Sequence, residues 1–375
     1  MLVGWAPLAA QANPATQAVP DTERRLTRHW IDHLYPFVYY TSADKFWVAG
    51  HYDWSSPLGF AERPEPYFAR AALDVGASTQ GSYAVILDAQ APAYWDGWRL
   101  GLTVSFVRAN RLGYYGQGNN TIYDADSAAA STYFYRVSRT NRAARATIQR
   151  RIIGPLRALI GGSIEHAEFR ALPGTTLYQR DSTGPFNDAV ARAGFVFDTR
   201  DVEADPHRGV FAEALIASGR GYTRATGSLH AYVHPIDRLI LAGRIGAENI
   251  NGTAPISVQQ TMESSEGQIV ALGGIRSLRG YYDGRFLGPG KLVGGVEARY
   301  GLLWAPRLLE LKLIAFYDVG RVFAPGESVR LTREGLHGAL GGGVALALLR
   351  NSLLAIEVAK GTEPMLFTFA TAWTF

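Results

Sequence analysis

The stretch KLVGGVEARYGLLW, residues 291–304, alternates between two kinds of side chain. Because successive side chains of a β-strand point to opposite faces, it predicts a strand with one apolar and one polar or small face. The segments LELKLIAFYDVG (309–320) and SLLAIEVAKG (352–361) repeat the pattern. In the first stretch the two phases are Leu292, Val296, Ala298, Tyr300 and Leu302 on one face, and Gly295, Glu297, Arg299 and Gly301 on the other.

Extended over the chain, this reading predicts sixteen strands. Segments of about ten residues or longer suit tilted strands that cross a membrane. The expected fold is an all-β, sixteen-stranded antiparallel transmembrane barrel. The segments are 35–41, 45–55, 66–75, 80–90, 97–109, 130–150, 155–168, 188–200, 208–218, 222–234, 237–249, 291–304, 309–321, 337–348, 351–360 and 365–375.

The links between these segments differ in length on the two sides. Links such as LLRN (348–351) and IIGP (152–155) are tight, whereas 110–129, 169–187 and 250–290 are long. Short periplasmic turns and long outer loops are typical of outer-membrane barrels. A large soluble all-β domain would explain the alternation but not this asymmetry. We therefore expect an integral protein of a bacterial outer membrane, surrounded by outer-membrane lipids and lipopolysaccharide.

Composition excludes several classes of protein. Of 375 residues 47% are hydrophobic and 19% charged, and no apolar run approaches the roughly 18 residues of a membrane helix. The chain has no cysteine, which excludes disulfides and thiolate metal sites. The net charge of +4 comes from scattered basic residues, so no nucleic-acid partner is expected.

The two ends of the chain carry their own signals. Residues 1–12 resemble the remnant of a secretory signal peptide, although no Lys or Arg precedes them, and an ordinary disordered terminus is the alternative. Residues 13–34 are expected to be a periplasmic segment, with a short amphipathic helix over 21–34 or a disordered leader, before a barrel over 35–375. At the other end, the last strand places its aromatic residues in one phase up to the terminal residue, as in sorting signals of outer-membrane barrels: Phe367, Phe369, Trp373 and Phe375.

Four motifs together resemble the superfamily of outer-membrane insertases and two-partner-secretion transporters that includes BamA, TamA and FhaC. They are the hairpin FVFDTRDVEADPHRGVFAEALIAS (195–218), the segment LGGIRSLRGYYDGRFLGPGKLVGGVEARY (272–300), FYDVG (316–320) and YYGQGNNT (114–121). The hairpin supplies five candidate residues: Asp198, Arg200, Asp201, Pro206 and Gly209.

The resemblance implies that the loop at about 250–290 folds back into the lumen, where its Leu278-Arg279-Gly280-Tyr281 motif docks on the wall. The strand phase independently turns Asp318, Glu297 and Glu357 inward. A guanidinium forks two hydrogen bonds onto one carboxylate, so we expect Arg279 to pair with Asp318, with the other two acids as alternates. Gly280 lets the backbone turn, and Tyr281 anchors the tip. Small residues are expected to leave room for that tip: Gly320, Gly341 and Gly343.

The seam between the first and last strands is a second candidate site. The first strand is short and carries Pro36, which cannot donate to a ladder. In insertases of this superfamily a weak seam is a lateral gate that templates incoming strands by β-augmentation; the alternative is an ordinary closed barrel. The seam residues are Pro36, Tyr39, Phe369, Trp373 and Phe375.

Catalytic and metal motifs are missing from the sequence. There is no HExxH or GxSxG, and GPGK (288–291) lacks the spacing of a phosphate loop. His230 and His234 share a strand face but have no third ligand, so we expect no metal, no cofactor and no enzymatic activity.

The resemblance implies assistance in inserting or translocating proteins at the outer membrane. Periplasmic POTRA domains are usual in the superfamily, but they do not fit before the first predicted strand, so the match is to a barrel-only branch or to a truncated form. The expected partners are client outer-membrane proteins, a periplasmic or lipoprotein partner, or a second copy of the chain. The alternatives are a stand-alone structural or membrane-organising plugged barrel and a passive pore.

Overall fold

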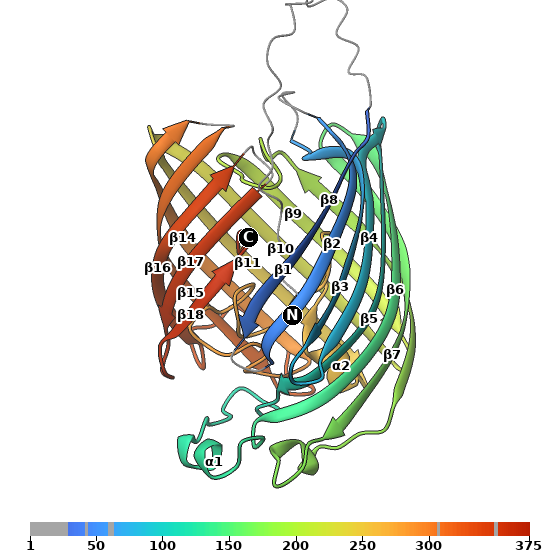
Figure 1. Cartoon of the computed structure of the whole chain (residues 1–375), viewed down its shortest axis with the longest axis vertical. Coiled ribbons are helices and arrows are strands. Elements are labelled where there is room, and N and C mark those ends of the chain that lie inside the picture. Colours follow the sequence, from blue (N-terminus) through green and yellow to red (C-terminus); the bar gives the residue numbers. More distant parts are fainter. Residues whose placement is uncertain (1–28, 42–43, 59–63, 306–307, 349–351) are drawn as a thin grey trace, which may run out of the picture.

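The computed structural model describes residues 29–41, 44–58, 64–305, 308–348 and 352–375. Sixteen strands form one antiparallel sheet in chain order, curled into a barrel (Figure 1). The strands are β1 (Ile31–Thr41), β2 (Lys45–Pro57), β3 (Tyr67–Ser78), β4 (Tyr83–Trp95), β5 (Trp98–Gly113), β6 (Arg136–Ile153), β7 (Leu156–Ala171), β8 (Phe186–Asp198), β9 (Gly209–Gly219), β10 (Tyr222–Ile236), β11 (Leu239–Gly252), β14 (Gly290–Ala305), β15 (Leu309–Phe323), β16 (His337–Leu348), β17 (Ser352–Lys360) and β18 (Leu366–Ala370).

The predicted sixteen-stranded barrel is confirmed, with differences at its two ends. β1 begins at Ile31, so the prediction of a helix is wrong for residues 31–34. The rest of that predicted helix, and the predicted signal remnant at 1–12, lie outside the described residues. β18 ends at Ala370, five residues before the predicted end of the last strand.

Side chains alternate between the outside and the lumen as their phase predicts. In β14, Val296 and Tyr300 are 60% and 45% exposed, whereas Glu297 and Arg299 are 3% and 0% exposed. The outer face is apolar because it meets lipid, and the lumen takes the polar side chains. Most of the charge in the strands is therefore directed into the interior, where it is available to bind an inserted segment.

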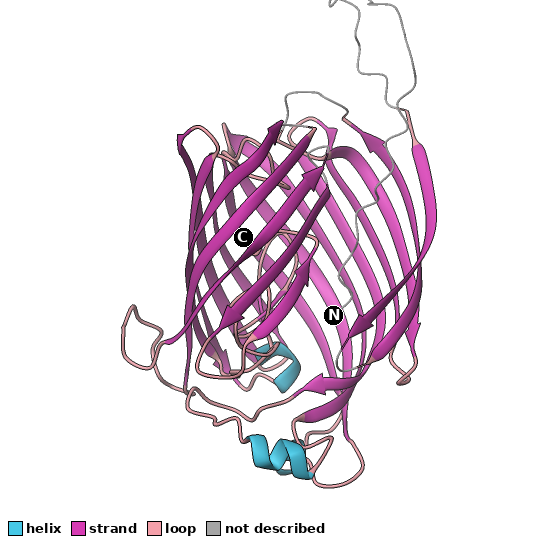
Figure 2. Cartoon of the chain, turned by 60° about the vertical axis from the view of Figure 1, so that its left-hand side comes forward, coloured by secondary structure: helices cyan, strands magenta, loops and turns pink. Residues whose placement is uncertain are grey.

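The links confirm the predicted asymmetry. One end of the barrel, which we call the long-loop end, carries helix α1 (Ala125–Ala130) within the link 114–135 (Figure 2). The opposite, short-turn end has two-residue turns such as 96–97 and 154–155. Among the described residues, no helix has the length and apolar character needed to cross a bilayer. The other long links at the long-loop end are 172–185, with η1 (Leu177–Arg180), 253–289 and 324–336, whereas links such as 79–82 and 220–221 at the same end are short.

The two ends of the sheet are β1 and β18. Each has one hydrogen-bonded neighbour, β2 and β17 respectively, and the described residues show no ladder between them. In Figure 1 the two edge strands, blue and red, face each other at the front of the barrel. The sheet is thus curled but not closed by hydrogen bonds.

Candidate functional site

The link 253–289, called the luminal loop here, runs inside the barrel (Figure 2). It contains α2 (Ile256–Gln259) and a small hairpin of β12 (Thr261–Met262) and β13 (Ile269–Val270). Its apolar residues pack on inward residues of β14 to β16 in one buried cluster. A loop of this length is uncommon in a compact domain unless it has a function, and here it fills much of the lumen.

Arg279 is the centre of a buried ionic cluster. Its Nε donates to Asp318 Oδ2 at 2.8 Å, and its Nη2 donates to Asp318 Oδ1 at 3.1 Å, so the guanidinium grips this carboxylate with two bonds. Its Nη1 donates to Glu297 at 2.6 Å and to Glu357 at 3.1 Å. The sequence left open which carboxylate pairs with Arg279, and the structure brings all three to it.

The environment of Arg279 keeps it charged. Burial alone disfavours the guanidinium cation, but Glu297 and Asp318 outweigh it and raise the pKa of Arg279 above its ordinary value. The guanidinium also lies 3.3 Å from the ring centroid of Phe316, a cation–π contact strengthened by the complete burial of Arg279. Arg299 donates to the other oxygen of Glu297 at 2.7 Å. The loop is therefore fixed to β14, β15 and β17 through one side chain.

The neighbours of Arg279 shape the tip. Gly280 has φ +96°, and an added Cβ would lie 2.9 Å from the Cβ of Ala339, so both the backbone and the space require glycine. Leu278 is fully buried within the loop cluster. The Tyr281 hydroxyl accepts a hydrogen bond from the N–H of Thr362 at 3.2 Å, which ties the tip to the β17–β18 link.

The three small residues predicted to receive the loop differ in their contacts. A Cβ added at Gly320 would lie 2.4 Å from Leu272 of the loop, so Gly320 receives it directly. At Gly341 the Cβ would meet the Phe316 ring at 2.3 Å, which makes room for the ring beneath Arg279. At Gly343 it would meet the Ile356 carbonyl of the neighbouring strand at 2.1 Å. Gly343 therefore leaves room for the backbone of the neighbouring strand β17.

A second anchor, which the sequence analysis missed, has the opposite charge arrangement. Glu263 of the loop accepts from Arg145 of β6 at 2.9 Å and from Arg192 of β8 at 3.4 Å, and Arg224 of β10 lies 3.7 Å away. Burial disfavours its carboxylate, yet the three arginines lower the pKa of Glu263. One loop cation thus sits among wall anions on one side, and one loop anion among wall cations on the other. In the sequence, only the inward strand phase of Arg145, Arg192 and Arg224 could have indicated this anchor.

The hairpin link, residues 199–208, also folds inward. Arg200 donates to Asp198 at 2.9 Å and pairs with Glu266 of the luminal loop. Asp201 Oδ1 accepts the backbone N–H groups of Val202, His207 and Arg208 at 3.0 to 3.2 Å, which holds the turn. Gly209 has φ +112°, and an added Cβ would lie 2.3 Å from the Thr199 carbonyl oxygen. Pro206 is buried and lines the lumen near the C-terminus.

The prediction that residues 371–375 continue the last strand is wrong. Phe367 and Phe369 are 75% and 57% exposed on the outer face, but Trp373 and Phe375 are 6% and 8% exposed because the tail, residues 371–375, turns into the lumen. Trp373 Nε1 donates to Asp205 at 2.7 Å. Stronger partners in the lumen thus override the local strand pattern.

Further contacts hold the tail. Arg299 donates to the Phe375 carbonyl at 3.2 Å, and its guanidinium lies 3.6 Å from the Trp373 ring centroid. Arg244 donates to the Thr374 carbonyl at 3.2 Å. Of the other predicted seam residues, Tyr39 stacks on Trp47 at 5.7 Å between centroids, and Pro36 faces outward. The tail and the Arg279 cluster therefore share Arg299.

Within the described ranges, one group of three residues has donors suited to a metal ion. Side-chain oxygen or nitrogen atoms of Asp205, His207 and Glu310 lie within 4.8 Å of one another. The Lys312 ammonium, however, lies 2.7 Å from Asp205 and 2.9 Å from Glu310. Lys312 supplies the positive charge that a metal would otherwise bring. His230 instead packs against Phe211 and Phe375.

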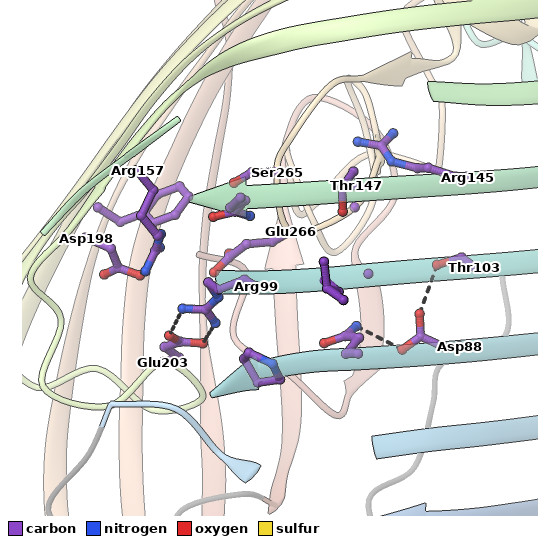
Figure 3. A pocket seen from close by; sticks show the side chains of 17 residues that line it. Asp88, Arg99, Thr103, Arg145, Thr147, Arg157, Asp198, Glu203, Ser265 and Glu266 are labelled. Carbon is purple, nitrogen blue, oxygen red and sulfur yellow. Dashed lines mark hydrogen bonds and ion pairs between the residues drawn. The ribbon is translucent and has the colours of Figure 1, made fainter. Parts of the chain in front are cut away.

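Beside the loop, a cavity of about 290 Å³ remains in the lumen (Figure 3). It is polar, and Arg99 of β5 closes one side by a two-bond contact of 2.6 Å with Glu203 of the hairpin link. Asp88 accepts from Thr103 on another side. Because cations and anions on its wall are paired, the cavity suits water better than a charged ligand.

The YYGQGNNT motif caps the lumen at the long-loop end. Asn119 accepts from the Val322 N–H at 2.9 Å and donates to the Gly335 carbonyl at 2.8 Å. Arg285 of the luminal loop donates to Thr121 Oγ1 at 2.6 Å. The Tyr115 and Tyr282 rings stack with centroids 5.6 Å apart. The motif thus joins the outer loops to the luminal loop.

Comparison with known proteins agrees with this geometry. The Omp85 superfamily domain matches residues 69–353, most of the barrel and all of the luminal loop. The chain belongs to the Omp85 superfamily. No curated protein sequence matches it.

Solved structures of Omp85 barrels share its fold. BamA from Haemophilus ducreyi lacking POTRA domains 1–3 has a TM-score of 0.57 at 13% identity, over 91% of this chain and 70% of that one. CdiB from Escherichia coli has a TM-score of 0.56 at 11% identity, over 90% and 61%. This chain thus spans less than two thirds of the length of CdiB. The Omp85 assignment makes it an integral outer-membrane protein of the insertase and transporter type.

Proposed function

We propose that this Omp85 protein assists the insertion or translocation of other polypeptides at the outer membrane, without enzymatic chemistry, through the seam between β1 and β18. One observation carries the proposal: β1 and β18 are both edges of the sheet. An edge strand presents unpaired N–H and C=O groups that can pair with an incoming strand. Client outer-membrane proteins are the substrates that this chemistry fits.

The contents of the lumen support the seam as the route. The luminal loop is anchored on opposite charges at Arg279 and Glu263. Breaking a buried ion pair costs about 3 to 5 kcal/mol, so moving the loop aside for a polypeptide is expensive. The seam, in contrast, has no ladder among the described residues to break. A plugged barrel with only a structural role is the alternative that this lumen also favours.

The test is the folding of a client barrel into proteoliposomes that contain the protein. Folding is followed by the gel-mobility shift of the client on heating. The expected result is faster folding than in empty liposomes, and equal rates would remove the proposal in favour of the structural barrel.

A reversible disulfide across the seam tests whether the client enters through the seam or by another route. Because the chain has no cysteine, pairs of cysteines can be introduced without background at outward positions of the two edges: Leu34 or Val38 with Phe367 or Phe369. A pair that oxidises should abolish the acceleration, and reduction should restore it. Acceleration that survives oxidation would contradict the seam mechanism.

A further inference from the structure

The outer face of β5, β6 and β7 carries cations near the long-loop end. Arg142 lies opposite Phe106 of β5 and His166 of β7, and Arg108 lies opposite Thr140. Partners across an antiparallel ladder share a face. Arg170 of β7, which lies opposite Ser138 of β6, points the same way. We call Arg108, Arg142 and Arg170 the cationic rim.

The rim begins where the apolar band ends. On β5 the outward residues Leu102 and Val104 are 42% and 41% exposed, and Arg108 follows two outward positions after Val104. On β7, Ile164 is 64% exposed, and Arg170 is the third outward position after it. In a barrel whose long loops face outward, this level is that of the outer-leaflet headgroups.

The guanidinium groups of the rim lack strong protein partners. In the described part of the chain, neither Arg108 nor Arg142 makes a hydrogen bond or ion pair, and Arg108 Nε is buried without a partner. The Arg142 guanidinium lies 5.0 Å from the Phe106 ring centroid. Arg170 pairs with Glu168 at 2.8 Å, but its side chain is 69% exposed. Such an exposed pair is weak and exchangeable.

The concentration of charge on this wall is local. At the same end of β9 to β11, the outward positions Ser218, Thr223, Asn249 and Asn251 are uncharged. Lipid alone does not require arginine there, because the amide and hydroxyl groups of the other wall meet the same headgroup layer. The three arginines therefore distinguish this wall from that of β9 to β11.

We propose that the cationic rim binds phosphate groups of an outer-leaflet glycolipid, the lipid A part of lipopolysaccharide. A guanidinium forks two hydrogen bonds onto a phosphate, and the three arginines on adjacent strands lie within two outward positions of one another along the ladders. Phe106 and the apolar band beneath contact the acyl chains. The strands fix the backbone positions of the three arginines, so only the side chains have to be ordered on binding.

The experiment measures binding of bisphosphorylated lipid A to the detergent-purified full chain by native mass spectrometry. We expect saturable binding that weakens at least roughly tenfold in the variant R108Q/R142Q/R170Q, because basic side chains at an anionic membrane surface contribute to its attraction. The matched control is R150Q/R151Q, which removes two arginines of β6 at the short-turn end and should bind as the unaltered chain does. The heat-induced gel shift verifies that each variant is folded.

Three outcomes would overturn the proposal. Equal binding by the rim variant would assign the lipid to the general apolar surface. Equal binding of lipid A stripped of its phosphates would remove the phosphate contact. Competition by inorganic phosphate at the concentration of the lipid would make the rim a site for free anions. The single variant Arg142→Gln, with an intermediate loss expected, keeps the test decisive if the triple variant fails to fold.

Discussion

The indole N–H of Trp373 donates to the carboxylate of Asp205, a residue 168 positions earlier in the chain. This contact joins the C-terminal tail to the link between β8 and β9, and Lys312 binds the same carboxylate at 2.7 Å. The tail therefore leaves the sheet for a charged site in the lumen. As a result, β18 keeps only the five residues 366–370 with which to face β1.

Trp373→Phe should release the tail. A hydrogen bond to a charged group contributes roughly 1.5 to 3 kcal/mol, so we expect carboxypeptidase to remove Phe375 on the order of tenfold faster than in the unaltered protein. Mass spectrometry of the C-terminal peptide measures the rate. Trp98→Phe, at a 41% exposed position on β5, is the matched control. An unchanged rate for the first variant would show that the indole does not hold the tail.

Arg279→Ala should leave a barrel that inserts but whose luminal loop is sensitive to protease. Removing one partner of a buried pair costs about 3 to 5 kcal/mol because the other charges remain buried. Limited proteolysis and the temperature of the gel shift measure the effect. Arg279→Lys should recover only part of it, because an ammonium cannot fork onto Asp318.

Arg330→Ala is the control for the loop, since Arg330 is 57% exposed in its pair with Glu327. It should change neither proteolysis nor heat stability. If Arg279→Ala behaves like this control, Arg279 does not lock the loop.

Glu263→Gln should loosen the opposite side of the same loop. The amide keeps the shape of the side chain but leaves Arg145, Arg192 and Arg224 without their shared anion. In planar bilayers we expect small, flickering currents from the unaltered plugged barrel, and larger and more frequent current steps from Glu263→Gln. Two independent anchors should give stability losses that add to within about 0.5 kcal/mol in the double variant with Arg279→Ala. Steady open-pore currents from the unaltered protein would instead favour the passive pore.

The stability of the luminal contacts around Asp205, which bind the tail, should depend on pH through His207. Burial disfavours its imidazolium, but hydrogen bonds to Asp205 and Glu310 prevail and raise the pKa of His207 from 6.5 to about 9. The stabilisation is complete below pH 6.5 and is lost as the pH rises through 9. It amounts to on the order of 3 to 4 kcal/mol, at about 1.4 kcal/mol per pKa unit.

The temperature of the heat-induced gel shift, measured from pH 6 to pH 10, checks this expectation. The unaltered protein should lose stability toward pH 10, whereas His207→Gln should show a flatter profile. Parallel profiles for the two proteins would assign the pH dependence to other groups.

The alternating pattern predicted much of this site because strand phase is a local property. Once Glu297, Asp318 and Glu357 are placed on strands, their inward direction follows from a period of two. The prediction that these carboxylates contact Arg279 came from the motif resemblance, because a loop has no alternating pattern that gives the direction of its side chains. For the same reason Glu263 was missed: nothing local in MESSEGQ (262–268) states which wall it contacts.

The tail shows where a local pattern loses to distant partners. MLFTFATAWTF alternates correctly for a strand, and Phe367 and Phe369 follow it. The residues beyond Ala370 instead meet Asp205 and Arg299, contacts that no short window of sequence contains. Propensity is a weak prior when buried charged hydrogen bonds are available.

The two oppositely charged anchors of the luminal loop, Glu263 and Arg279, also determine which part of the barrel wall is stiff. Glu263 ties the loop to β6, β8 and β10, and Arg279 ties it to β14, β15 and β17. The loop therefore acts as a brace across the wall from β6 to β17. Among the residues that the structure describes, the luminal loop has no such anchor on strands β1 to β4. If the barrel widens, we therefore expect these first strands to move outward while the wall from β6 to β17 keeps its curvature.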